Sequence, residues 1–196
     1  MKKEYFEWIK SWCDKTTEKD LPRVLLVGDS ITDGYQAKVR ELLSGVCYVD
    51  YIATSYAIDS PMYVQLVKNF VKDSDYALVH FNHGLHGLHI PTRTYKSLMR
   101  KLSDWMLQRT KVVFALSTHV MAEGSKRSSG RWMKIVRPRN KAVLSLAATK
   151  NCAVDDLFTV STTLKERTED GVHFMPEGYA VLAAKVAESI QAALNQ

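Results

Sequence analysis

Short apolar runs alternate along the chain with longer segments whose apolar residues recur at helical spacing. The run Val24–Val27 is continuously apolar, which is typical of a strand buried on both faces of a parallel sheet. Similar runs predict four further strands: Val46–Ala53, Tyr76–Phe81, Lys111–Leu116 and a short one beginning at Cys152–Val154. The predicted helices are Gln36–Leu43, Met62–Val71, Thr92–Gln108, Arg137–Thr149 and Pro176–Leu194. Strands separated by helices predict a three-layer α/β/α sandwich around a central, mainly parallel sheet of about five strands.

The length and composition are those of one globular domain. A chain of 196 residues with 46% hydrophobic residues can bury a core of its own. We therefore expect a single domain over residues 1–196. Residues 1–22 are expected to form an N-terminal extension, with a helix over Glu4–Trp12 packed on the outside.

Polar residues at the end of the first strand indicate chemistry. Gly28, Asp29 and Ser30 follow the run directly, and ligands of open parallel sheets bind at the carboxyl ends of the strands. A serine becomes a nucleophile only with a base to take its proton, and Asp170 and His173 are the right residue types for a base and its orienting carboxylate. The pattern predicts a serine hydrolase that needs no metal and no other cofactor.

Two sequence blocks carry a resemblance to a known family. VLLVGDSITDGY and DGVHFMPEGYAVLA resemble the first and last blocks of the GDSL, or SGNH, hydrolase superfamily, whose four blocks supply a Ser, a Gly, an Asn and a His. The resemblance implies a flavodoxin-like fold and an esterase in which Ser30 is the nucleophile, His173 the general base and Asp170 its partner. It also implies that the Ser30 N–H donates to the oxyanion, and it makes Asp29 a candidate substrate-binding residue.

The third block matches with substitutions. In HFNHGLHG, Asn82 falls on the Asn of the family, while His80 and His83 replace the usual Gly and Asp. The resemblance implies that the Asn82 amide donates to the oxyanion; the alternative is that Asn82 only caps a turn. His86 lies near the same edge and is a second candidate for substrate binding.

The second block departs most from the family. Ala53–Ala57 has no glycine, and Ser55 is the best match by position. Any residue except proline offers a backbone N–H. Ser55 is therefore expected to provide the third oxyanion donor.

The charge distribution bears on the substrate. The net charge is +6, from 27 basic and 21 acidic residues. Seven basic residues and no acidic one lie between Lys126 and Lys141. This run either attracts an anionic substrate, such as a uronic-acid polymer, or is simply a solvated helix flank. No aromatic residues are interleaved as in a nucleic-acid platform, so no nucleic-acid partner is predicted.

Four histidines recur every third residue: His80, His83, His86 and His89. A histidine-rich tract can bind zinc or copper. Gly84, Gly87 and Pro91 instead indicate a loop leaving a strand, and no Glu or Cys lies among the histidines. We therefore predict no metal site.

The substrate is less determined than the reaction class. The loops are short and polar, which favours a small acyl group, such as acetyl, on a carbohydrate. Trp132 is either a packing residue or a sugar-stacking surface. The alternatives are a lipid esterase or thioesterase of the same superfamily, or a catalytically weak binding module on this fold.

The first residues lack the apolar core of a secretory leader, and no apolar stretch is long enough to predict a membrane span. The expectation is a cytoplasmic protein without a membrane partner, or a periplasmic or secreted one if the chain has been trimmed. The three cysteines are scattered and form no CxxC pair. Nothing in the sequence indicates the oligomeric state.

Overall fold

A computed structural model describes residues 2–121 and 129–196. Within these residues a six-stranded sheet has the order β1-β3-β2-β4-β5-β6. Its strands are β1 (Ile9–Trp12), β2 (Arg23–Gly28), β3 (Tyr48–Thr54), β4 (Tyr76–Phe81), β5 (Lys111–Ala115) and β6 (Val154–Asp155). All pairings are parallel except that of β1 with β3. The predicted, mainly parallel sheet is confirmed, with one strand more than expected.

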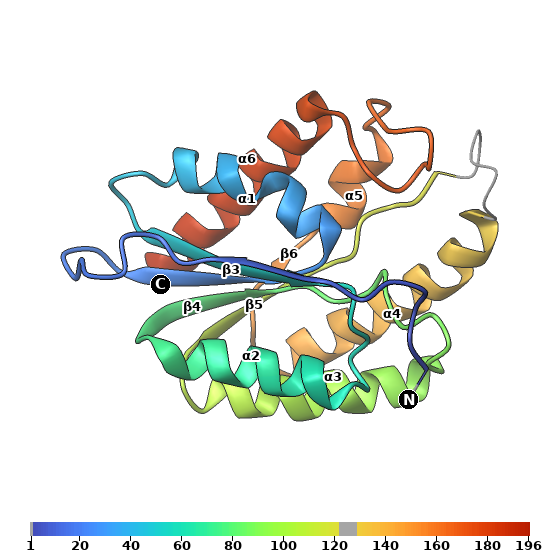
Figure 1. Cartoon of the computed structure of the whole chain (residues 1–196), viewed down its shortest axis with the longest axis horizontal. Helices are drawn as coiled ribbons and strands as arrows, with labels where there is room; N and C mark the ends of the chain where they lie inside the picture. Colours follow the sequence, from blue (N-terminus) through green and yellow to red (C-terminus); the bar gives the residue numbers. More distant parts are fainter. Residues whose placement is uncertain (1, 122–128) are drawn as a thin grey trace.

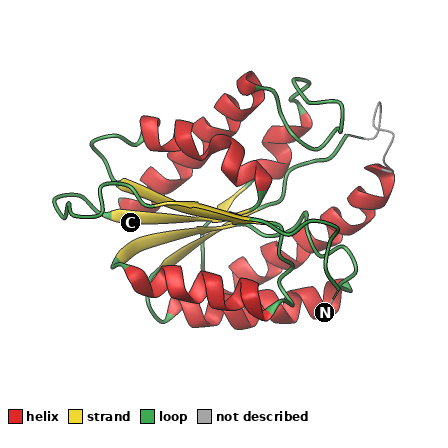
Figure 2. Cartoon of the chain, in the orientation of Figure 1, coloured by secondary structure: helices red, strands yellow, loops and turns green. Residues whose placement is uncertain are grey.

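Helices cover both faces of the sheet (Figures 1 and 2). They are α1 (Ser30–Leu42), α2 (Pro61–Asp73), α3 (Thr92–Leu107), α4 (Ser129–Lys150), α5 (Leu157–Thr162) and α6 (Pro176–Leu194). α1, α5 and α6 lie on one face, and α2, α3 and α4 lie on the other. The predicted three-layer α/β/α sandwich is confirmed. No helix within the described ranges is long and apolar enough to span a membrane.

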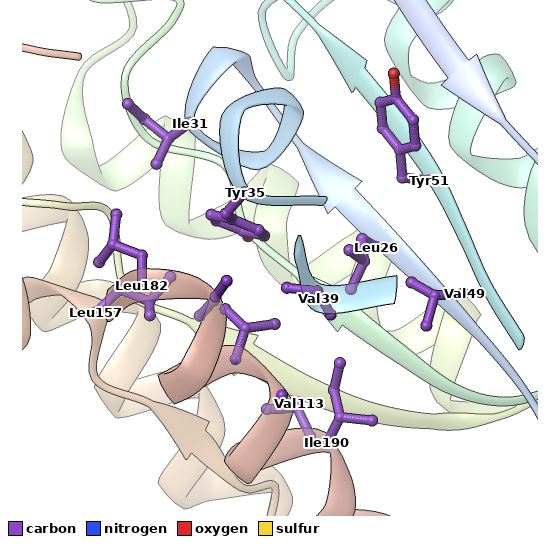
Figure 3. Packing of buried hydrophobic residues seen from close by; sticks show 14 of the residues in the cluster. Leu26, Ile31, Tyr35, Val39, Val49, Tyr51, Val113, Leu157, Leu182 and Ile190 are labelled. Atoms are coloured by element: carbon purple, nitrogen blue, oxygen red, sulfur yellow. The ribbon is translucent and has the colours of Figure 1, made fainter. Parts of the chain in front are cut away.

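The central strand β2 joins the two cores. Every residue of β2 is buried, and successive side chains of a strand point to opposite faces. Val24 and Leu26 therefore pack under α1 and α6, and Leu25 and Val27 belong to the core on the α2–α4 side. Figure 3 shows Leu26 among the residues of the first core. A continuously apolar strand is thus what a sheet with helices on both faces requires.

The N-terminal segment contradicts the sequence prediction. The helix expected over Glu4–Trp12, and with it a helical extension over residues 1–22, is wrong for the described residues, since Ile9–Trp12 forms β1. Ile9 pairs with Thr54 at the edge of β3. Without β1, the backbone N–H and C=O groups of β3 would form an open edge. That distant partner outweighs the local helical pattern.

Smaller differences concern helix boundaries. α1 begins at Ser30, earlier than predicted, and α4 begins at Ser129 instead of Arg137, while the short helix α5 was not predicted. Gly34 interrupts the helical pattern of α1, yet it is needed for packing, because a Cβ there would lie 2.2 Å from the Tyr179 ring of α6. The close contact between α1 and α6 therefore requires glycine at position 34.

Candidate active site

The nucleophile candidate Ser30 lies where β2 becomes α1. Asp29 is the N-cap of α1, and its Oδ1 accepts the Ile31 N–H at 3.0 Å. Ser30 is therefore the first helical residue, where backbone N–H groups have no partner inside the helix and the helix dipole favours negative charge. A Cβ at Gly28 would lie 1.9 Å from Thr32 Oγ1, so only glycine allows this tight exit from the strand.

Asp29 has a structural role in this turn. Its side chain is buried, with 3% exposure, and one carboxylate oxygen caps α1. Asp29 does not line the pocket around Ser30. The structure therefore gives no support to substrate binding by Asp29, which was one of the sequence predictions.

Ser30, His173 and Asp170 form a continuous hydrogen-bond chain. His173 Nε2 lies 2.7 Å from Ser30 Oγ, and His173 Nδ1 lies 2.5 Å from Asp170 Oδ2. A proton on Nδ1, facing the carboxylate, leaves Nε2 free to accept the serine proton. The structure thus brings together three residues that the sequence placed at opposite ends of the chain.

A short turn prepares the Asp170 carboxylate for this role. Its Oδ1 accepts the N–H groups of Val172 and His173 at 2.8 and 2.9 Å and the Thr168 hydroxyl at 2.7 Å. Partial burial by itself raises the pKa of Asp170, but the hydrogen bonds from His173, Thr168 and Val172 together lower it well below its usual range. Asp170 is therefore ionised at neutral pH and holds the imidazole of His173.

Asn82 follows β4 at the same edge of the sheet. Its backbone N–H donates to the Val27 carbonyl at 2.8 Å, and its side-chain Nδ2 donates to the Ala115 carbonyl at 3.0 Å. The amide nitrogen has two hydrogens, so the bond to Ala115 orients the side chain and uses only one of them. The second N–H is the one that an oxyanion would need.

Ser55 does not fit its predicted role. Its backbone N–H donates to the Trp8 carbonyl at 3.3 Å, and its hydroxyl donates to Glu7 at 2.8 Å and accepts the Trp8 N–H at 2.9 Å. The N-terminal segment thus occupies the N–H group that was expected to bind the oxyanion. The sequence could not indicate this, because the partner is the unpredicted edge segment.

A cavity of about 120 Å³ opens at the serine. It is lined by Ser30, Leu85, His86, Val120, Trp132, Asp170, Val172 and His173. His86 and Trp132 are candidates from the sequence, whereas Leu85, Val120 and Val172 are not. These three are common apolar residues in loops and carried no signal in the sequence. They give the cavity an apolar wall beside the polar Ser–His–Asp chain.

His86 is held on this wall by the N-terminal segment. Its Nδ1 lies 3.0 Å from the Glu4 carboxylate, and its ring meets the Trp8 ring edge-on at 6.3 Å. Burial by itself lowers the pKa of His86, but the hydrogen bond to Glu4 and the nearby charges of Asp29 and Glu7 raise it above its usual range. His86 lines the cavity, at the sheet edge where the sequence placed it, and its part in substrate binding stays a prediction.

The other histidines of the series have separate environments. His80 pairs with Asp155 at 2.9 Å in the core, and His89 pairs with Asp59 at 3.1 Å. His83 packs between aromatic rings, and burial, with Arg139 nearby, lowers its pKa to about 3. In the ranges 2–121 and 129–196 no three His, Cys, Asp or Glu residues form a group that could hold a metal ion.

The basic run is only partly open to comparison with the structure. Lys126 and Arg127 lie outside the described residues. Arg137 and Lys141 are exposed, as a solvated helix flank would be, whereas Arg139 is completely buried. Arg139 therefore belongs neither to a solvated flank nor to a surface that attracts an anionic substrate.

Comparison with known proteins places this architecture. No known family pattern and no curated protein matches the chain by sequence. An acetylxylan esterase from Geobacillus stearothermophilus is similar in structure, with a TM-score of 0.70 at 16% identity, over 86% of this chain and 94% of that one. A protein described as a GDSL-like lipase from Parabacteroides merdae has a TM-score of 0.67 at 17% identity, over 87% and 95%.

A third structure completes the comparison. A protein described as an SGNH hydrolase from Slackia heliotrinireducens has a TM-score of 0.66 at 16% identity, over 87% of this chain and all of that one. At 16–17% identity these similarities concern the fold. The chain has the α/β/α fold of the SGNH hydrolases, as the resemblance of its sequence blocks implied.

Proposed function

We propose that this protein is an SGNH-type serine esterase that removes a small acyl group, such as acetyl, from a carbohydrate. The observation that carries the proposal is the hydrogen-bond chain from Ser30 through His173 to Asp170 at the carboxyl edge of the sheet. Such a chain is what activates a serine hydroxyl at neutral pH.

The first step is attack on the ester carbonyl. His173 Nε2 takes the proton of Ser30 as its Oγ bonds to the carbonyl carbon, and the carbonyl oxygen becomes an oxyanion. The N–H of Ser30, at the N-terminus of α1, and the second N–H of Asn82 are the donors we assign to this oxyanion. His173 then gives its proton to the leaving alcohol, which leaves an acyl group on Ser30.

The second step repeats the chemistry with water. His173 removes a proton from a water molecule, which attacks the acyl carbon, and the proton is returned to Ser30 as the acid departs. Asp170 stays ionised throughout and stabilises the imidazolium. The mechanism uses no metal and no organic cofactor.

The size and lining of the cavity support a small acyl group. A volume of about 120 Å³ is less than the roughly 300–1,000 Å³ of sites that bind drug-sized ligands. Leu85, Val120 and Val172 suit a methyl group. Trp132 lines the same cavity and packs partly against the core, and it is the aromatic residue that we assign to contact with a sugar. The structural similarity to an acetylxylan esterase agrees with this choice.

A lipid ester or thioester is the second candidate, because the same cavity wall is largely apolar. Rates with p-nitrophenyl esters of two to eight carbons separate the two candidates. We expect the acetyl ester to be cleaved fastest. A clear preference for the octanoyl ester would overturn the small-acyl proposal.

The proposal is tested by comparing the wild type, Ser30→Ala and Ser44→Ala in p-nitrophenyl acetate hydrolysis at pH 8. Ser44 is an exposed serine that follows the C-terminal end of α1, whereas Ser30 begins this helix. Ser44→Ala therefore serves as the matched control. Ser30→Ala should abolish hydrolysis and labelling by a fluorophosphonate and leave the free energy of unfolding within about 0.5 kcal/mol. An unchanged rate would mean another nucleophile, and inactivity of the wild type would favour the binding module.

A further inference from the structure

Arg139 of α4 is the largest completely buried side chain of the described residues. None of the ion pairs in the described ranges includes it. A buried charge without a carboxylate is costly unless other polar groups compensate it. Burial of the Arg139 guanidinium therefore requires polar partners other than a carboxylate.

The guanidinium is compensated by the backbone of one loop. Its Nη1 donates to the carbonyls of Gly84 and His86 at 2.9 and 2.7 Å, and its Nη2 donates to Gly87 at 2.6 Å and more weakly to Ile90 at 3.5 Å. The guanidinium lies over the Tyr95 ring at 4.6 Å. The carbonyls of the loop thus converge on a single cation.

Tyr95 reinforces the same arrangement. Its hydroxyl donates to the His83 carbonyl, the first of the loop. The loop, residues 83–90, is therefore held from α3 by Tyr95 and from α4 by Arg139. Without the guanidinium, the carbonyls of Gly84 and His86 would lose their donor, and a carbonyl left without a donor inside the protein is unfavourable.

This loop forms one wall of the candidate active site. It begins immediately after Asn82, the proposed oxyanion donor, and it carries Leu85 and His86 of the cavity. Arg139 itself does not line the cavity. It acts on the site only through the loop.

We propose that Arg139 is a positioning residue, whose guanidinium holds loop 83–90 so that Asn82, Leu85 and His86 keep their places at the site. The role in turnover rests on the function proposed above, whereas the ordering of the loop does not. A displacement of about 1 Å in a catalytic arrangement can cost about 10²-fold in rate. Arg139 is thus expected to influence catalysis without touching the substrate.

The test compares Arg139→Met with Arg137→Met, an exposed arginine of the same helix. Amide hydrogen exchange is measured residue by residue, and kcat and KM are measured with p-nitrophenyl acetate. For Arg139→Met we expect amides of residues 83–90 to exchange at least about 10-fold faster while those of β2 are unchanged, and kcat to fall about 10²-fold. Arg137→Met should match the wild type in both readouts.

Arg139→Lys provides the second variant if Arg139→Met does not fold. Lysine keeps the charge but is a point charge without the fork that reaches several carbonyls, so both effects should be smaller and in the same direction. A variant with normal exchange in the loop and kcat within about twofold of wild type would overturn the proposal. So would faster exchange throughout the protein with unchanged kcat. An inactive wild type would contradict only the proposed function, since the exchange of the loop would still be decisive.

Discussion

The molecule contains two histidine–aspartate pairs that share their chemistry and differ in their surroundings. His173 and Asp170 lie 2.5 Å apart with side chains 37% and 42% exposed, and the second ring nitrogen of His173 reaches Ser30. His80 and Asp155 lie 2.9 Å apart with side chains that are completely buried. The second nitrogen of His80 has no partner in the described residues. Exposure and a third hydrogen-bond partner, more than residue type, therefore distinguish the two pairs.

The largest expected effect is a loss of kcat when the exposed pair, His173 with Asp170, is changed. Asp170→Asn should lower kcat by about 10⁴-fold, because the amide no longer holds the imidazole in the reactive tautomer. The variant should stay folded, since the Asp170 side chain is 42% exposed and lies outside the core. Steady-state kinetics beside Glu169→Gln, a neighbouring exposed carboxylate, measure the effect. A loss of less than about tenfold would remove Asp170 from the mechanism.

The next largest effect is a loss of protein stability when the buried pair, His80 with Asp155, is changed. Asp155→Asn replaces the carboxylate of a fully buried pair by a neutral amide and should lower the free energy of unfolding by up to about 3–5 kcal/mol. Below the unfolding transition, kcat should change little, because the pair does not line the cavity.

Urea unfolding beside Asp104→Asn gives the contrast. Asp104 pairs with Lys150 at the surface, and such pairs contribute at most about 1 kcal/mol. Equal losses in the two variants would mean that the buried pair is unimportant. A large loss of kcat in folded Asp155→Asn would mean that the two pairs are coupled.

The smallest effect concerns a third pair of intermediate exposure, His86 with Glu4, whose side chains are 13% and 40% exposed. Burial lowers the pKa of His86 but Glu4 raises it more, so the folded value exceeds 6.5. The stabilisation by protonated His86 is therefore complete below pH 6.5 and is lost as the pH rises through the folded value. The pKa of Glu4 is lowered from 4.5, burial notwithstanding, because His86 donates to it. Its contribution is lost as the pH falls.

Near pH 5.5–6.5, where both groups are charged, Glu4→Gln should destabilise the protein by less than about 1 kcal/mol. At pH 9, where His86 is neutral, the variant should be as stable as the wild type. Unfolding free energies at the two pH values measure this difference. Glu41→Gln breaks an exposed pair with Lys38 and should show no such loss between pH 6 and 9. A Glu4→Gln effect of equal size at both pH values would show that the contact is not ionic.

Local sequence patterns determined much of this protein. The apolar run before Gly28 predicts a buried strand, and the small polar residues after it predict the turn that places Ser30 at the sheet edge. Asp170 and His173 are three residues apart, so one turn, with the Val172 and His173 N–H groups bound to the carboxylate, arranges the pair by itself. These predictions depend on contacts between residues that are close in the sequence, and such contacts can be inferred from the local sequence alone.

The tertiary structure decided the contacts between distant segments. The bond of Ser30 to His173 joins residues 143 positions apart. Residues Ile9–Trp12, predicted to be helical, instead form β1, because they pair with the edge of β3. The same N-terminal segment accepts the Ser55 N–H at Trp8, so this N–H is not available to an oxyanion. Arg139, a member of an apparently solvated basic run, became a buried centre for loop 83–90. Hydrogen-bonding groups must find partners wherever the fold leaves them. Which partner is within reach depends on the packing of the whole chain, and no local pattern records it.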